Sequence, residues 1–151
     1  MNTNFDILKA TRDNYLKAIE GLTLEELNTI PKGFNNNIIW NVTHVVVTQQ
    51  LLCYGLTGNR IRLSEQIITD YRKGSKPKGP VNQADVDQTI SWLTDSIDWV
   101  KEDYEMGIFK EYKHYPTSYG FVLNSIEDAI TFNNIHEGMH LGWVGAIKKC
   151  L

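Results

Sequence analysis

The chain contains 151 residues, of which 42% are hydrophobic and 22% are charged, and its formal net charge is −3. This charge gives no electrostatic basis for binding nucleic acid or an anionic membrane surface. A chain of this length can bury enough apolar surface to fold without a disulfide or a structural metal, and we expect a single domain over residues 1–151.

The sequence has the features expected of a soluble, cytoplasmic protein. Residues 1–20 carry charges throughout, whereas a signal peptide has an apolar centre. No apolar stretch approaches the roughly 20 residues that a membrane-spanning helix needs. Cys53 and Cys150 lie far apart and nothing marks them as a disulfide, so we expect both to be reduced.

The first predicted helix begins near Thr3, whose hydroxyl can cap the amide of Asp6, and it ends at Gly21. Thr23 is followed three residues later by Glu26, a capping box that predicts a short helix. The apolar residues of the first helix recur at helical spacing: Phe5, Leu8, Tyr15, Leu16 and Ile19.

Residues 38–56 are apolar on almost every side, and their assignment from sequence is the most difficult. The runs 38–40 and 45–47 are rich in strand-forming residues, but strands seldom exceed about ten residues, so the length favours a helix. Asparagines at 35–37 offer an N-terminal cap, and Gly55 and Gly58 mark the end. A helix with so wide an apolar surface is typical of a bundle core.

Residues 59–81 are polar and basic, and they contain glycines and prolines. We predict a short helix from Ser64 to Tyr71 there, within a long connection of the length that a crossover needs. Asn82 caps the next helix, which Gly107 ends. Its apolar residues step by four and three and predict one buried seam: Val86, Ile90, Leu93, Ile97, Val100 and Tyr104.

Residues 108–120 are rich in aromatic side chains and predict a second long connection, extended in part. Ser125, with Asp128 three residues later, predicts the start of the last helix, which runs to about Lys149. These elements together predict an all-α protein, a four-helix bundle with long crossover connections.

The last helix carries two histidines, His136 and His140, whose spacing of four places them on one helical face. This spacing allows two imidazoles to bind the same metal ion. His44 lies on an apolar face of the segment 38–56. Each histidine taken alone is equally compatible with a core residue whose ring nitrogens are hydrogen-bonded.

The combination of the three histidines favours a metal site. Three buried imidazoles need partners for all their nitrogens, and a divalent ion would satisfy one nitrogen on each ring. We predict that His44, His136 and His140 bind the ion, and that Asn41 or Thr48 supports His44. Three ligands leave a coordination position for water or substrate, as in catalytic sites.

Two other motifs coincide with the same string. His136–His140 matches the H-E-x-x-H signature of zinc proteases, with Glu137 as the base, but no suitable downstream ligand follows it. Glu137 and His140 also match half of the di-iron bundle motif, but Asn41 stands where the second half requires a glutamate before His44. The di-iron interpretation therefore fails, and the protease interpretation receives little weight.

Two residues near the predicted site have open roles. Glu137 is either an assisting base or a carboxylate that lies at the surface or beside a metal ligand. His114 lies in the second long connection, where we expect it to be solvated. It is a lesser candidate for an extra ligand or a proton carrier.

The sequence resembles the DinB-like family, the damage-inducible group that includes metal-dependent thiol S-transferases. The resemblance spans nearly the whole chain. It depends above all on the order of one histidine in the second long helix and two in the last, which His44, His136 and His140 match. The segments that carry it are Ile38–His44, Tyr71–Pro77, Ser118–Gly120 and His136–Trp143.

The resemblance implies a four-helix bundle with a three-histidine site for nickel, zinc or iron, frequently as a homodimer. It also implies that the metal binds a low-molecular-weight thiol as the thiolate, which then attacks an electrophile or isomerises a substrate. We therefore expect a metal-dependent thiol S-transferase or hydrolase with a small-molecule substrate. The alternatives are a non-catalytic, stress-associated metal-binding bundle and, third, a peptidase.

Overall fold

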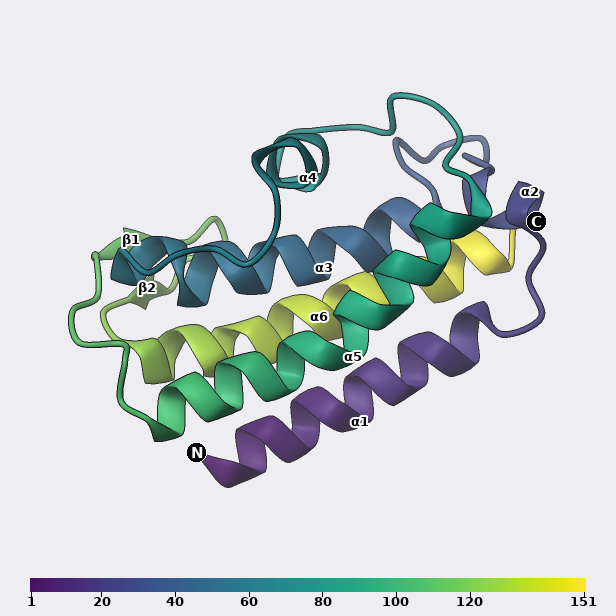
Figure 1. Cartoon of the computed structure of the whole chain (residues 1–151). Helices are drawn as coiled ribbons and strands as arrows, with labels where there is room; N and C mark the ends of the chain where they lie inside the picture. Colours follow the sequence, from purple (N-terminus) through teal and green to yellow (C-terminus); the bar gives the residue numbers. More distant parts are fainter.

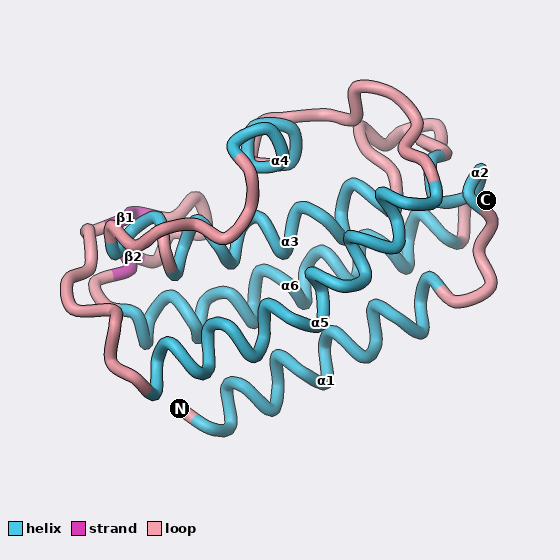
Figure 2. The backbone as a smooth tube through the Cα atoms, viewed as in Figure 1, coloured by secondary structure: helices cyan, strands magenta, loops and turns pink.

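Four long helices lie side by side in the computed structural model, which describes residues 1–151. Figure 1 shows the bundle, and Figure 2 shows that helices make up most of the chain. The predicted all-α four-helix bundle is therefore confirmed. The long helices are α1 (Asn2–Ile19), α3 (Ile38–Cys53), α5 (Gln83–Glu105) and α6 (Ile126–Lys148), and the short elements are α2 (Leu24–Asn28), η1 (Gly55–Thr57), α4 (Glu65–Tyr71), β1 (Tyr115–Pro116) and β2 (Val122–Leu123).

The order of packing places α6 between α1 and α3, and α5 also packs against both of these helices. Helices α3 and α5 run in the same direction, whereas α1 and α6 run in the opposite one (Figure 1). The connection between α3 and α5 therefore returns along the length of the bundle. It carries α4 across the outer side of α3, and this placement brings the end of α4 close to the α3–α6 contact.

Polar side chains cap most of the helices where the sequence predicts them. Asn37 accepts a hydrogen bond from the amide of Trp40, and Thr23 and Glu26 form a reciprocal capping box. Asn82 forms a capping box with Asp85 at the start of α5, and Ser125 accepts a hydrogen bond from the amide of Asp128 at the start of α6. The exception is α1, where the prediction of Thr3 as the cap is wrong: the helix already begins at Asn2, with no side-chain cap.

Helix α3 is buried at nearly every position, as its apolar composition predicts. The α-helix ends at Cys53, slightly earlier than the predicted end at Leu56, and a 3-10 turn over Gly55–Thr57 follows. Gly58 then adopts a φ of +69°, a left-handed conformation that favours glycine. The chain can therefore leave the bundle axis immediately after α3.

The apolar core consists of two clusters, one toward each end of the bundle. One includes Tyr15 and Val42, and the other includes Phe5 and Leu52. A layer of buried polar side chains lies between the clusters, and all four long helices contribute to it. Its members are Arg12, Gln49, Ser96, Asn133 and Glu137.

The predicted seam of α5 is largely confirmed. Val86, Leu93 and Val100 are buried, whereas the alternate seam residues Ile90, Ile97 and Tyr104 are only half-buried. Polar residues take the neighbouring inward positions, and these are Thr89, Ser96 and Asp103. None of the helices has the length and apolar character that crossing a membrane requires.

The second long connection contains a short antiparallel pair of strands, in which Tyr115 lies opposite Leu123 and Pro116 opposite Val122. It joins α5 to α6 at one end of the bundle (Figure 1). This segment is extended in part, as predicted. Its aromatic residues cover the adjoining ends of α3 and α6, where they form one wall of a cavity.

Candidate metal centre

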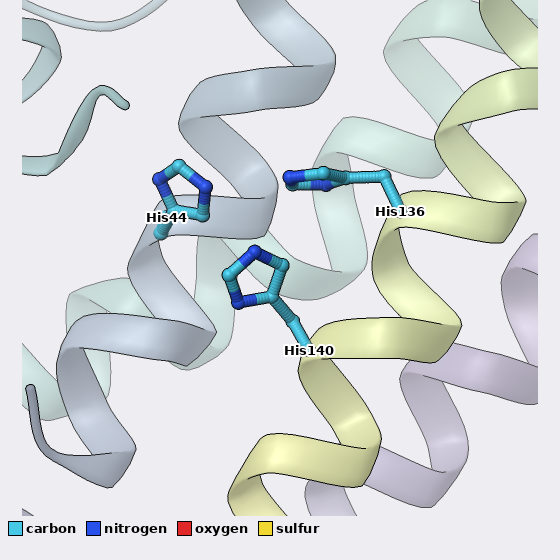
Figure 3. Close-up of side chains that lie close together, drawn as sticks. All are labelled: His44, His136 and His140. Carbon is cyan, nitrogen blue, oxygen red and sulfur yellow. The ribbon is translucent and has the colours of Figure 1, made fainter. Parts of the chain in front are cut away.

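His44, His136 and His140 converge between α3 and α6. One possible ligand atom from each lies within 4.8 Å of the others, and such a group could hold a metal ion. The ring centroid of His44 is 4.6 Å from that of His140 and 5.2 Å from that of His136. Figure 3 shows the three imidazoles pointing toward one another from the two helices.

The hydrogen bonds of His44 fix its tautomer. Its Nδ1 lies 2.6 Å from the backbone oxygen of Tyr71, at the end of α4. A carbonyl oxygen only accepts, so Nδ1 carries the proton and Nε2 is left with a free lone pair. Thr48 lies 3.3 Å from this Nε2 and donates to it. Trp40 stacks on the ring with 10° between the planes, so the imidazole is held on both its edge and its face.

Asn41 fixes the tautomer of His140 in the same way. Its Oδ1 lies 2.8 Å from Nδ1 of His140, while its Nδ2 donates to the backbone oxygen of Asn37. The amide orientation is therefore set, and His140 must donate from Nδ1 and keep the lone pair on Nε2. The prediction that Asn41 supports His44 is wrong, because the side chain reaches across to α6 instead; Thr48 does contact His44.

His136 differs from the other two because neither of its nitrogens has a hydrogen-bond partner. Its Nδ1 is fully enclosed by protein and unpaired. An unpaired buried polar atom is unfavourable in a folded protein, where nearly all such atoms are bonded. The geometry of α6 explains how the residue is held: His136 is one turn from His140, with 4.5 Å between the ring centroids.

All three imidazoles are held in the neutral form. Burial lowers the pKa of His136 to about 3, with a further contribution from His140 and His44. Burial and the neighbouring His44 lower the pKa of His140 to about 4. Burial also lowers the pKa of His44, against the opposing effect of its bond to Tyr71. Metal ligands must be unprotonated, so little proton competition is expected at neutral pH.

These features fit a divalent ion. Two of the rings have a lone pair directed by a fixed tautomer, and the third has no hydrogen-bond partner on either nitrogen. Nitrogens on one ion at about 2.1 Å can be no more than about 4.2 Å apart. The observed separations are within 4.8 Å, so displacements of less than about 1 Å would bring all three onto one ion.

A cavity of about 710 Å³ opens over the three histidines. The end of α3, the turn after it and α6 provide apolar walls, including Leu51, Leu56 and Phe132. The connection after α4 and the loop around β1 complete the rim, with Lys73 and Tyr119 among their side chains. The volume lies within the range of roughly 300–1,000 Å³ that small-molecule sites occupy.

Glu137 does not belong to this cavity. It is fully buried on the side of α6 that faces the bundle interior, where both carboxylate oxygens bond to Arg12, at 2.5 and 2.7 Å. Asn133 donates to the same carboxylate at 2.7 Å. Neither open role for Glu137 is correct: it is neither an assisting base nor a carboxylate at the surface or beside a ligand. It forms a structural ion pair in the polar layer.

His114 is exposed, as the sequence predicts, and it lies outside the cluster. Its Nδ1 contacts Oδ1 of Asn124, 2.9 Å away. The sequence interpretation missed Tyr71 because it acts through its backbone oxygen, which leaves no side-chain signal. Arg12 was missed because its spacing among charged residues of the first helix gives no sign that it points inward.

Comparison with protein families supports a relationship along nearly the entire chain. The sequence model of the DinB superfamily matches residues 7–144, which include all three clustered histidines. No curated protein matches the chain. The match covers far more than half of the sequence and agrees with the helical fold, so the chain belongs to the DinB superfamily.

Proposed function

We propose that the protein binds a divalent metal ion through His44, His136 and His140 and uses it to activate a small thiol. The observation that carries the proposal is the convergence of three neutral imidazoles, two with fixed tautomers, on one cavity. Nickel, zinc and iron are all compatible with imidazole ligands. The substrate is a small molecule because the volume of the cavity is in the range that small-molecule sites occupy.

When bound, such an ion lowers the pKa of a thiol or water placed on it, so that a nucleophile is available at neutral pH. The protein orients the imidazole rings and limits the access of water to the site. Asn41 and the Tyr71 carbonyl hold two of the rings, and Trp40 packs flat against His44. The apolar walls limit the access of water to the reacting groups.

The chemistry of the cavity wall favours thiol transfer over hydrolysis. A metal hydrolase commonly places a carboxylate beside the attacking water as general base. No aspartate or glutamate lines this cavity, and Glu137 is engaged elsewhere. A thiol needs no such base once its pKa is lowered, since the thiolate is itself the nucleophile. The same observation argues against a peptidase.

Metal analysis of the wild type beside His44→Ala tests the site. We expect close to one equivalent of metal in the wild type and a loss of it in the variant. Cobalt substitution then reports on thiols, because a thiol that reaches the ion changes the absorption spectrum. The absence of bound metal after incubation with nickel, zinc and iron would refute the proposal.

A non-catalytic metal-binding bundle is the second candidate. It is favoured by the lack of any carboxylate that could act as an acid or base among the side chains that line the cavity. A screen of thiol donors against several electrophiles separates the two functions. If metal binds but no thiol changes the cobalt spectrum, the non-catalytic function is the better description.

We also propose a homodimer in the cytoplasm. One face of α6 exposes Ile135, Met139 and Trp143, which follow one another at intervals of four and are 41–54% exposed. Gly138 and Gly142 on the same helix have open space beside them, so a second helix could approach closely. Cys53 and Cys150 are both free thiols, in keeping with a reducing compartment. Sedimentation of the wild type and Ile135→Lys tests the dimer, which the charged variant should dissociate.

A further inference from the structure

The cavity beside the histidines is lined by one positive charge and by no negative one. Among the side chains that line it, Lys73 is the only charged one, and no carboxylate faces it. Histidine binds a metal as a neutral imidazole, so three histidines would leave the charge of a divalent ion uncancelled. A ligand that carries negative charge would therefore meet a favourable potential over the whole cavity.

Lys73 belongs to a basic stretch in a protein whose formal net charge is −3. Residues 72–78 contain two lysines besides Lys73, together with Arg72, and no acidic residue. Lys78 forms an ion pair with Asp70 at the edge of α4. Arg72, Lys73 and Lys76 form no salt bridge, so their charge is free to attract a ligand.

The backbone fixes this stretch to the histidines. Tyr71, two residues before Lys73, accepts the 2.6 Å hydrogen bond from His44. Ser75 then donates to the backbone oxygens of Asp70 and Arg72, which closes the turn. Gly74 has a φ of +88°, a conformation that favours glycine. Lys73 and Gly74 both line the cavity, so the start of the connection is held at its rim.

Apolar side chains lie on the cavity walls near these polar groups. Leu51 and Leu52 belong to α3, Leu56 to the turn after it, and Phe132 and Met139 to α6. A ligand that fits would have one end that reaches the histidines, an apolar body and one charged group at the rim. Lysine is a flexible point charge and can meet such a group without a fixed geometry.

We propose that the thiol used by this protein is an anionic one, whose carboxylate or similar group is bound by Lys73. The proposal rests on the proposed function, because the opposite end of the ligand is placed at the histidines. It names a specificity residue outside the metal ligands. Lys73 would select between thiols of equal length by their charge, and the apolar walls would not distinguish them.

The test compares matched thiols on the cobalt-substituted protein. One series consists of ω-mercaptocarboxylates and the other of ω-mercaptoalcohols of the same chain lengths. We expect the wild type to bind the best carboxylate about 5- to 20-fold more tightly than its alcohol partner. Lys73→Met should remove most of this preference and leave the affinity for the alcohol unchanged, whereas Lys73→Arg should retain the preference.

Two control variants make the result specific. Lys76→Met removes a charge from the same connection at a residue that does not line the cavity, and Lys101→Met removes an exposed charge from α5. Both should keep most of the preference for carboxylates. Equal binding of the two series by the wild type, or an unchanged preference in Lys73→Met, would overturn the inference alone. If neither series alters the cobalt spectrum, the proposed thiol chemistry fails, and the inference fails with it.

Discussion

Two faces of α6 carry buried polar side chains, and they differ in whether these side chains have hydrogen-bond partners. On the interior face, Glu137 is bonded to Arg12 and Asn133, and the pair is almost completely sealed from solvent. On the neighbouring face, His136 and His140 present lone pairs to a cavity, and one nitrogen of His136 is unpaired and enclosed. Glu137 is therefore fully hydrogen-bonded within the protein, whereas its sequence neighbour His136 has a nitrogen with no hydrogen-bond partner. We call the face with Glu137 the closed side of α6, and the face with His136 and His140 the open side, or open face.

The comparison separates structural from functional polarity. Arg12 also donates to the backbone oxygen of Leu93 in α5, and Tyr15 donates to the backbone oxygen of Glu137. This closed network joins α1, α5 and α6, and so it restricts rotation of α6 about its axis. The rotation of α6 about its axis determines where His136 and His140 point. We therefore infer that the hydrogen bonds of Glu137 on the interior face keep the two histidines directed at the cavity.

Among the substitutions, the largest expected effect on stability comes from breaking the closed side. Arg12→Met or Glu137→Met should destabilise the protein by about 3–5 kcal/mol, because each leaves a buried charge without its partner. Urea denaturation of the metal-free protein measures this loss. The double variant Arg12→Met/Glu137→Met should be more stable than either single variant, since it leaves no isolated charge.

A further variant, Glu137→Gln, decides whether Glu137 has a chemical role. If it served as a base, Glu137→Gln would abolish activity while stability stayed near that of the wild type. We expect the reverse, a loss of stability in Glu137→Gln, with metal still bound by whatever fraction remains folded. A stable Glu137→Gln variant would contradict the description of Glu137 as part of a structural ion pair.

The open side should respond in the opposite manner. His136→Leu removes a possible ligand together with an unpaired buried nitrogen. Metal affinity should fall by more than about 100-fold, beyond the usual effect of losing a residue that merely supports a ligand. The stability of the metal-free protein should change by no more than about 1 kcal/mol. Calorimetric titration and urea denaturation of one sample provide both values, and a large loss of metal-free stability would contradict this view.

Much of the fold could be predicted from sequence because it follows from local patterns. The seam of α5, the asparagine cap of α3 and the capping box at Thr23 all depend on residues close together in the chain. The histidine cluster could also be predicted from the sequence. His136 and His140 share a face by helical geometry alone. His44 was added because three imidazoles on apolar helix faces together need partners for all their nitrogens, which a metal ion can supply.

The contacts between distant residues could not be predicted. Arg12 and Glu137 are far apart in the chain, and in the sequence each looks like an ordinary helix-surface charge. The partner of Asn41 was misassigned because a residue one turn from His44 can also reach across to the neighbouring helix. Such choices depend on how α3 and α6 are rotated against each other, which a single sequence does not specify.

Asn41 and Thr48 offer a finer comparison within the open side. Asn41 holds Nδ1 of His140, the nitrogen that a metal does not need, whereas Thr48 contacts Nε2 of His44, which has the free lone pair. Asn41→Leu should therefore weaken metal binding by about 10- to 100-fold. Thr48→Val should leave it unchanged or slightly stronger, because a competing hydrogen bond is removed. Equal losses in the two variants would show that the assigned tautomers are wrong.

The pH dependence of stability in the metal-free protein tests whether the histidines of the open face are buried. In the unfolded chain the three imidazoles titrate near 6.5, whereas burial lowers the pKa of His136 to about 3 and that of His140 to about 4. Between these values the unfolded state binds more protons, by about two when both sites are counted, so stability must rise with pH in this range. Acidification from pH 6.5 toward pH 4 should therefore lower the urea midpoint.

Carboxylates also titrate toward the lower end of this range, so the double variant His136→Leu/His140→Leu provides the reference. Its midpoint should depend less on pH than that of the wild type between pH 6.5 and pH 4, and the difference should vanish above about pH 7. Arg12 and Glu137 stay paired in both proteins, so the closed face contributes equally and cancels. Identical pH profiles would mean that the histidines are already accessible to protons in the folded chain, and that the open face of α6 is more hydrated than its burial indicates.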